Sequence, residues 1–180
     1  MGSIFGIAAI KEEVFKDLEP YKLTTSPSYY PDKLETGTQN HEGIAGIRPA
    51  IEFFAGLGEG ETRRERILSG MEHIEAYENR LANQLREGLA AIRGVTVTQA
   101  AADVPKTPTV AFQVAGIEPG EVCRRLAEEC SIFVAAGHFY ASTLGDVLGV
   151  NGSGGWVRAG LAPYSTEEEV ERLIGAIKNF

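Results

Sequence analysis

The sequence has few of the residues that form cross-links or hold metal ions. It contains two cysteines, Cys123 and Cys130, which lie seven positions apart and outside the CxxC spacing. Two cysteines at this spacing argue against a disulfide framework and predict a reducing, cytoplasmic location. The three histidines, His41, His73 and His138, fall in separate segments. None pairs with another histidine or cysteine at the spacing of metal ligands, so no zinc site is expected.

The sequence also lacks long apolar runs and an excess of positive charge. No hydrophobic run approaches the roughly 20 residues that cross a bilayer, and the start, MGSIFGIAAIKEE, has no basic segment typical of a secretion signal. The net charge of -8 opposes binding to a phosphate backbone. We therefore expect neither a nucleic-acid partner nor a membrane partner. The content of 43% hydrophobic and 23% charged residues is typical of a globular domain.

The first 60 residues read as a remnant of a larger α/β domain. Residues 3–10 are apolar in both alternating sets, which predicts a strand buried on both faces, and residues 11–18 follow as a helix. One helix cannot cover both faces of a lone strand. The strand is therefore expected to belong to a parallel sheet whose other strands are not in this sequence, and the chain is interpreted as a fragment.

A second helix follows an irregular, proline-containing stretch and ends near residues 56–58. Its apolar positions share one face: Ile44, Ile47, Ile51 and Phe54. Pro49 lies inside the pattern and removes a backbone donor, so we expect a kink or a late start.

Residues 61–93 carry one long helical pattern with a single apolar stripe. A coiled coil is the alternative, but the stripe breaks at Glu78 and covers too few heptads. We interpret this segment as a helix that connects two domains.

Residues 94–180 alternate between strand and helix patterns. Strands are predicted over 94–99, 108–114, 131–137 and 155–162, and helices over 118–130 and 165–180. Ser165 and Glu168 have the spacing of a capping box for the last helix. This order predicts a small antiparallel sheet with helices on one side, which is an α+β unit.

The entry to the second helix is one candidate binding site. Gly37 lets the backbone approach a ligand closely, and the hydroxyls of Thr36 and Thr38 lie beside the amides of a helix N-terminus, an arrangement that favours an anion. Simple capping of the helix by Asn40 is the alternative, and local chemistry favours it.

Arg158 is the second candidate. It lies in the apolar strand GWVRAGL, where a buried guanidinium needs either an acidic partner or a ligand. Its planar fork suits a bidentate carboxylate, and a salt bridge to a neighbouring glutamate is an equal alternative.

The order of these segments resembles a known enzyme family. ETGTQNHEGIAGIRPAIEF, a long helix, GHFYAS and then VRAGLAPYSTEEEVERLIGAI resemble class V aminotransferases of fold type I, and within them the cysteine desulfurase-like branch. The resemblance extends from about Ser3 to the C-terminus and corresponds to the second half of such an enzyme. It implies the C-terminal part of the fold type I transferase fold: a remnant of the large domain over 1–60, a connecting helix over 61–93 and a small α+β domain over 94–180.

The resemblance also implies a cofactor, a substrate and partners. In this family Gly37 and Thr38 would reach across a dimer interface to the phosphate of pyridoxal 5'-phosphate. Arg158 would bind the α-carboxylate of an amino-acid substrate, and His138 would sit at the mouth of its pocket. The expected protein partner is a second copy in a homodimer or a complementary N-terminal half.

Two departures from the family pattern limit the expected activity. The Schiff-base lysine, the acidic partner of the pyridine nitrogen and the ring-stacking aromatic match positions upstream of this sequence. The desulfurase cysteine belongs to a GHHC loop, where this chain has GHFYAS with Tyr140 at that place, and Cys130 lies before the strand, where we expect it to pack.

We therefore expect the chain alone to be inactive and to carry no catalytic residue of its own. Within the family, β-elimination, transamination and racemisation are as compatible with the sequence as sulfur transfer. The alternative function is a non-catalytic α+β binding or interaction module derived from such an enzyme.

Overall fold

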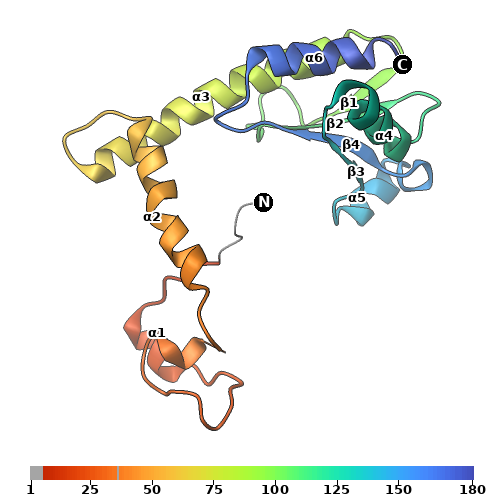
Figure 1. The fold of residues 1–180 in the computed structure, drawn as a ribbon. Helices are drawn as coiled ribbons and strands as arrows, with labels where there is room; N and C mark the ends of the chain where they lie inside the picture. The colour runs from red at the N-terminus through yellow and green to blue at the C-terminus, as the bar shows by residue number, and fades with distance from the viewer. Residues whose placement is uncertain (1–5, 36) are drawn as a thin grey trace. The chain divides into compact units, whose positions relative to one another are not determined.

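The computed structural model describes residues 6–35 and 37–180, and the chain divides into two compact units, residues 1–70 and 71–180 (Figure 1). None of the helices among the described residues is both long enough and apolar enough to cross a membrane. The long helix α3 (Arg63–Ala90) contains the boundary between the units.

The first unit contains little buried apolar surface. Its elements before α3 are α1 (Glu12–Asp17), the 3-10 turn η1 (Asp32–Leu34) and α2 (His41–Gly56). Phe15 is buried against the edge of Tyr30, with 5.1 Å between the ring centroids. The strand predicted over 3–10 is not formed by residues 6–10, which are exposed and irregular, while residues 3–5 lie outside the described part of the chain. The prediction fails for 6–10 because no second strand of this unit pairs with them in the described ranges.

Helix α2 begins at His41, directly after its N-cap residue Asn40. Asn40 accepts a hydrogen bond from the Gly43 amide over 2.8 Å, so the capping alternative is confirmed. The helix runs through Pro49, and the late start is therefore wrong. Its apolar stripe, predicted to be buried, stays open in this unit: Ile44 is 42% exposed and Ile51 is 36% exposed.

The second unit is built on a four-stranded antiparallel sheet of order β1-β2-β4-β3. Its strands are β1 (Val95–Thr98), β2 (Thr109–Val114), β3 (Ala135–Gly137) and β4 (Trp156–Gly160). Its helices after α3 are α4 (Pro119–Cys130), α5 (Ser142–Val147), the 3-10 turn η2 (Asn151–Ser153) and α6 (Glu167–Ile177). The small antiparallel sheet is confirmed.

One face of this sheet and three helices enclose the core. The alternation of strands β2 and β4 directs their apolar side chains to the face that α3, α4 and α6 cover. The largest of these buried side chains are Leu81, Leu85, Leu89, Phe112, Leu126, Val157, Val170 and Ile177. Figure 1 shows α3 and α6 along one side of the sheet and α5 at the other side. On the second face, Trp156 is buried and Arg158 is exposed, so this face is open at Arg158.

Two local predictions for this unit need correction. Strand β3 is shorter than 131–137 because Ser131 adopts a left-handed conformation at the end of α4 (φ 54°), and the Ile132 amide still bonds back to Leu126 over 2.9 Å. The capping box of α6 is formed by Thr166 and Glu169, one residue after the predicted pair. The Ser165 hydroxyl instead accepts from the Ala162 amide.

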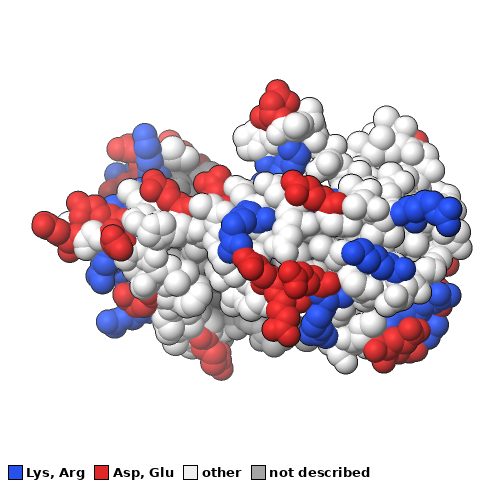
Figure 2. Space-filling model, turned by 90° about the horizontal axis from the view of Figure 1, so that it is seen from above, with Lys and Arg blue, Asp and Glu red and all other residues white. Residues whose placement is uncertain are grey.

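Charged side chains on the helix surfaces pair locally. On α4, Arg124 and Arg125 both donate to Glu121, at 2.7 Å each, and lower the pKa of that carboxyl to about 2. Figure 2 shows acidic and basic side chains interspersed across the face seen from above. These exposed pairs satisfy one another, so the helix surfaces carry no strong field of one sign there.

Arg86 is a buried charged residue that links α3 to the sheet. It is 6% exposed, and its Nη2 donates to the carbonyl oxygens of Thr107 (2.7 Å) and Thr109 (3.3 Å) at the start of β2. Burial lowers the pKa of this guanidinium. These bonds tie the start of β2 to α3.

We predict that Arg86→Met lowers the free energy of unfolding of the second unit by about 1–3 kcal/mol, the range for losing charged hydrogen bonds at a buried site. Arg172→Met is the matched control, because exposed Arg172 also donates to a backbone carbonyl, that of Cys130 at 2.8 Å. Chemical denaturation followed by circular dichroism measures both. If the free energy of unfolding fell equally in the two variants, the buried hydrogen bonds of Arg86 would contribute no more to stability than an exposed one.

Candidate functional site

The two predicted substrate residues, Arg158 and His138, both belong to the second unit. Arg158 is in the middle of the interior strand β4, with Ala111 of β2 and Ala135 of β3 as its cross-strand neighbours. The flanking residues Val157 and Ala159 point into the core, so Arg158 points away from it.

Arg158 is exposed, which corrects the expectation that it is buried. Its two alanine neighbours are too small to cover a guanidinium. No carboxylate lies within salt-bridge distance of it among the residues that the structure describes. The salt-bridge alternative is therefore not realised in the described chain, and the guanidinium edge is available to a ligand.

An aromatic ring packs on the guanidinium instead. The Cζ atom of Arg158 lies 4.2 Å from the ring centroid of Phe139, over the face of the ring. Phe139 belongs to the loop between β3 and α5 and is half-buried. The sequence analysis missed this contact. GHFYAS places an aromatic beside His138, but nothing in it indicates that the loop folds back over β4.

This loop has an unusual backbone. Phe139 and Tyr140 both have positive φ angles, 51° and 64°, which residues other than glycine rarely adopt. The Tyr140 amide donates to Nδ1 of His138 over 3.2 Å, and the Ala141 amide donates to the His138 carbonyl over 2.8 Å. Nδ1 of His138 is thus the acceptor in this contact. His138 holds the turn and faces solvent.

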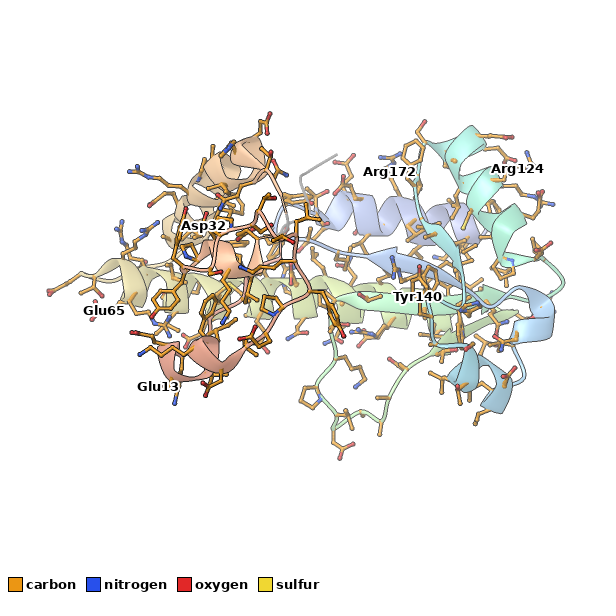
Figure 3. All side chains as sticks on the ribbon, turned by 90° about the horizontal axis from the view of Figure 1, so that it is seen from below. Glu13, Asp32, Glu65, Arg124, Tyr140 and Arg172 are labelled. Carbon is orange, nitrogen blue, oxygen red and sulfur yellow. The ribbon has the colours of Figure 1, made fainter. Side chains whose placement is uncertain are left out.

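Tyr140 extends away from the protein beside this turn. Its side chain is fully exposed, at 100%, and Figure 3 shows it beside the strands in the view from below. Trp156, on the same face of β4 as Arg158, is buried and donates from Nε1 to the Thr98 hydroxyl over 2.9 Å. The open face therefore combines a cation, aromatic rings and a hydroxyl.

A close backbone approach fixes the loop relative to β4. Gly155 has φ 85°, and a Cβ there would lie 2.5 Å from the carbonyl carbon and oxygen of Gly137. Only glycine allows the end of β3 and the start of β4 to meet in this way. This contact determines where the turn of His138, Phe139 and Tyr140 begins.

The second predicted site, at the entry to α2, lies in the first unit. Gly37 and Thr38 are exposed, and a Cβ on Gly37 would meet no atom within 4 Å. Thr36 lies outside the described residues. The His41 amide bonds to the Gln39 carbonyl and the Gly43 amide to Asn40, so the chain itself uses part of the helix N-terminus.

Neither packing nor a left-handed backbone requires glycine at position 37 in this chain. Open space on the backbone of Gly37 beside the Thr38 hydroxyl fits one part of an anion site. Amides of the first turn of α2 are already hydrogen-bonded within the chain. Residues at the entry to α2 could therefore form only part of a phosphate site, and other residues would have to complete it.

The remaining reactive groups of the described chain do not form a second centre. No three His, Cys, Asp or Glu residues of the described ranges are grouped to hold a metal ion. Cys123 and Cys130 are half-buried on α4 and pack against the core, and burial raises the pKa of the Cys123 thiol. A raised pKa opposes formation of the thiolate that nucleophilic cysteines need.

Comparison with known proteins places this arrangement in context. A family model described as Aminotransferase class-V matches residues 5–173. A probable cysteine desulfurase of Xylella fastidiosa is 31% identical over 147 residues, which are 82% of this chain and 31% of that protein.

Two solved structures are similar. The cysteine desulfurase CsdA of Escherichia coli, in its S-sulfonic acid form, superposes with a TM-score of 0.63 at 30% identity and covers 83% of this chain and 32% of its own. The apo cysteine desulfurase of Thermococcus onnurineus NA1 has a TM-score of 0.74 at 27% identity and covers 94% of this chain and 41% of its own. The chain thus spans about a third of the length of these relatives.

We predict that Gly155→Ala destabilises the second unit by about 2–3 kcal/mol, because the new Cβ adds left-handed strain and displaces the backbone of Gly137. Gly160→Ala is the control: Gly160 is the last residue of β4, the strand that Gly155 directly precedes, and its Cβ would meet no atom within 4 Å. Thermal unfolding measures both. A Gly155→Ala variant as stable as Gly160→Ala would show that the close approach does not hold the loop.

Proposed function

The chain belongs to the class V aminotransferase family, in its cysteine desulfurase-like part, and we propose that it is the C-terminal portion of a pyridoxal-phosphate-dependent enzyme that acts on a small amino acid. In this proposal the chain orients the substrate carboxylate and contributes to a phosphate clamp. The other two thirds of the family fold supply the groups that bind and activate the cofactor ring, and the chain by itself is inactive.

The free guanidinium edge of Arg158 carries this proposal. An arginine in the centre of a sheet, flanked by Ala111 and Ala135, has room for a ligand at its N–H groups. Its charge and fork geometry suit a carboxylate bound through two parallel hydrogen bonds. His138 directly precedes Phe139 in the adjacent turn, and it is proposed to line the approach to that edge. An amino acid fits this site, because every amino acid carries the α-carboxylate that Arg158 would bind.

Gly37 and Thr38 are proposed to clamp the cofactor phosphate of a neighbouring subunit. Their exposure supports a contact outside their own unit, and the open backbone of Gly37 supports close approach of an anion. When bound, pyridoxal phosphate supplies an electron sink for bonds at the substrate α-carbon. The proposed contribution of this chain is to hold its phosphate and to align the carboxylate relative to it.

The reaction is proposed to be one that needs no nucleophilic thiol from this chain. Tyr140 stands where the resemblance places the desulfurase cysteine, and a phenol does not form a persulfide. Cys123 is half-buried on α4, with its pKa raised by that burial. Elimination, transamination or racemisation at an amino acid therefore fits better than sulfur transfer.

A non-catalytic binding module is the second candidate. The closed core of the second unit favours it, because α3, α4, α6 and the sheet bury a complete set of apolar side chains without further residues. Such a module would need neither the guanidinium edge of Arg158 nor the entry at Gly37. The two candidates therefore differ in whether these groups respond to ligands.

We predict that small amino acids such as L-alanine shift the amide resonances of β4 and of residues 138–141 in the full chain. Arg158→Gln should weaken this response at least about tenfold, the loss expected for a charged bidentate hydrogen bond. Arg93→Gln, a change at an exposed arginine of the same unit, should leave it unchanged. Methylamine, which has an amine but no carboxylate, tests whether the carboxylate is recognised, and we expect it to cause no shift. A response to methylamine, or one that survives Arg158→Gln, would favour the module.

We also predict that pyridoxal phosphate and inorganic phosphate, but not pyridoxal, shift the amides of Gly37 and Thr38. Borohydride reduction of the pyridoxal phosphate mixture should label no single lysine specifically, because Nζ of Lys22 and of Lys33 already donates to neighbouring oxygens. Thr38→Val should reduce the phosphate response, and Thr62→Val serves as the control. Specific labelling of one lysine would mean that the chain binds the cofactor covalently and would overturn its inactivity.

A further inference from the structure

We infer that Phe139 is the positioning residue for Arg158: its ring holds one face of the guanidinium and leaves the N–H edge open to the substrate carboxylate. The inference rests on the proposed carboxylate-binding role of Arg158 and adds the group that orients it. Phe139 does not touch the substrate in this scheme and acts through the arginine.

The first support is the lack of other restraints on the guanidinium. Cross-strand neighbours usually restrain a long side chain on a sheet, but Ala111 and Ala135 end at Cβ. Within the described ranges, the Arg158 side chain makes no hydrogen bond or ion pair, and its contact is the one with the Phe139 ring at 4.2 Å. The ring is therefore the side-chain group that restrains the guanidinium among the described residues.

The second support is the backbone that presents the ring. Phe139 and Tyr140 are consecutive non-glycine residues with positive φ, and such strain persists only where the surroundings enforce it. The hydrogen bonds to His138 and the close packing of Gly155 on Gly137 enforce it here. The turn directs Phe139 back over β4 and Tyr140 outward to solvent, so the two aromatics have different roles.

The geometry separates the two interactions of the guanidinium. In a parallel stack, which the 4.2 Å between Cζ of Arg158 and the Phe139 centroid accommodates, the ring contacts the face of the guanidinium, whereas a bidentate carboxylate uses its edge in the plane. Both can therefore form at once. A guanidinium held in one plane loses less conformational freedom when a carboxylate binds, which strengthens binding without any new contact to the ligand.

The test uses the full chain with 15N- and 13C-labelled arginine. In the wild type, the side-chain protons of Arg158 should show an upfield ring-current shift and slowed rotation about the Nε–Cζ bond. Titration with L-alanine should shift the Arg158 Nε resonance. Phe139→Leu, which keeps an apolar side chain, should abolish the ring-current shift and weaken the apparent binding about three-fold, the effect of an exposed cation–π contact. Phe139→Tyr should restore both.

The outcomes separate this inference from the proposed function. If Arg158 responds to L-alanine equally well in the wild type and in Phe139→Leu, Phe139 is not a positioning residue, while the carboxylate-binding role of Arg158 stands. If Arg158 in the wild type does not respond, both are overturned. The amide resonances of Phe112 and Val157 report the core: unchanged positions in Phe139→Leu exclude a general loss of folding, and rescue by tyrosine excludes an effect of side-chain volume alone.

Discussion

The placement of β4 between β2 and β3 is the constraint on which the second unit depends. This strand is the last in the chain, and it pairs with two earlier strands at once. Because side chains alternate along a strand, the same pairing that buries Val157 and Ala159 in the core turns Arg158 to the open face. Packing of Val157 and Ala159 on one face therefore determines that Arg158 lies on the other face. A slip of one residue in the register of β4 would expose the apolar side chains and bury the charge.

The loop at the end of β3 adds a local feature to that frame. Gly155 lets the chain approach Gly137 at backbone distance, and the turn that follows accepts two left-handed residues. The stability of the helix-covered core offsets this strain, as strained turns require. The result is an arginine stacked on Phe139 with its edge free. A stable layer of helices on one face and a strained, exposed turn on the other form a common division between scaffold and site.

The first unit has the opposite character. It buries Phe15 and Ala55 but leaves apolar positions such as Ile44 and Ile51 of α2 open. The match to this chain covers only about a third of the length of two of the matched relatives. The polar entry at Gly37 and Thr38 lies at the start of this open helix, where a contact from outside the unit can reach it.

The sequence by itself determined the elements with strong periodicity: the long helix α3, the helix α4 with Pro119 in its first turn, the strands β1 and β2 and the antiparallel sheet. It also supported the family, because the ordered segments around Gly37 and Arg158 occur together. Local chemistry predicted the capping box one residue too early, since Ser165 and Thr166 each precede a glutamate by three positions. Only the tertiary structure decided that Arg158 is exposed and stacked on Phe139, because that contact joins residues on different segments through a backbone turn that no side-chain pattern encodes.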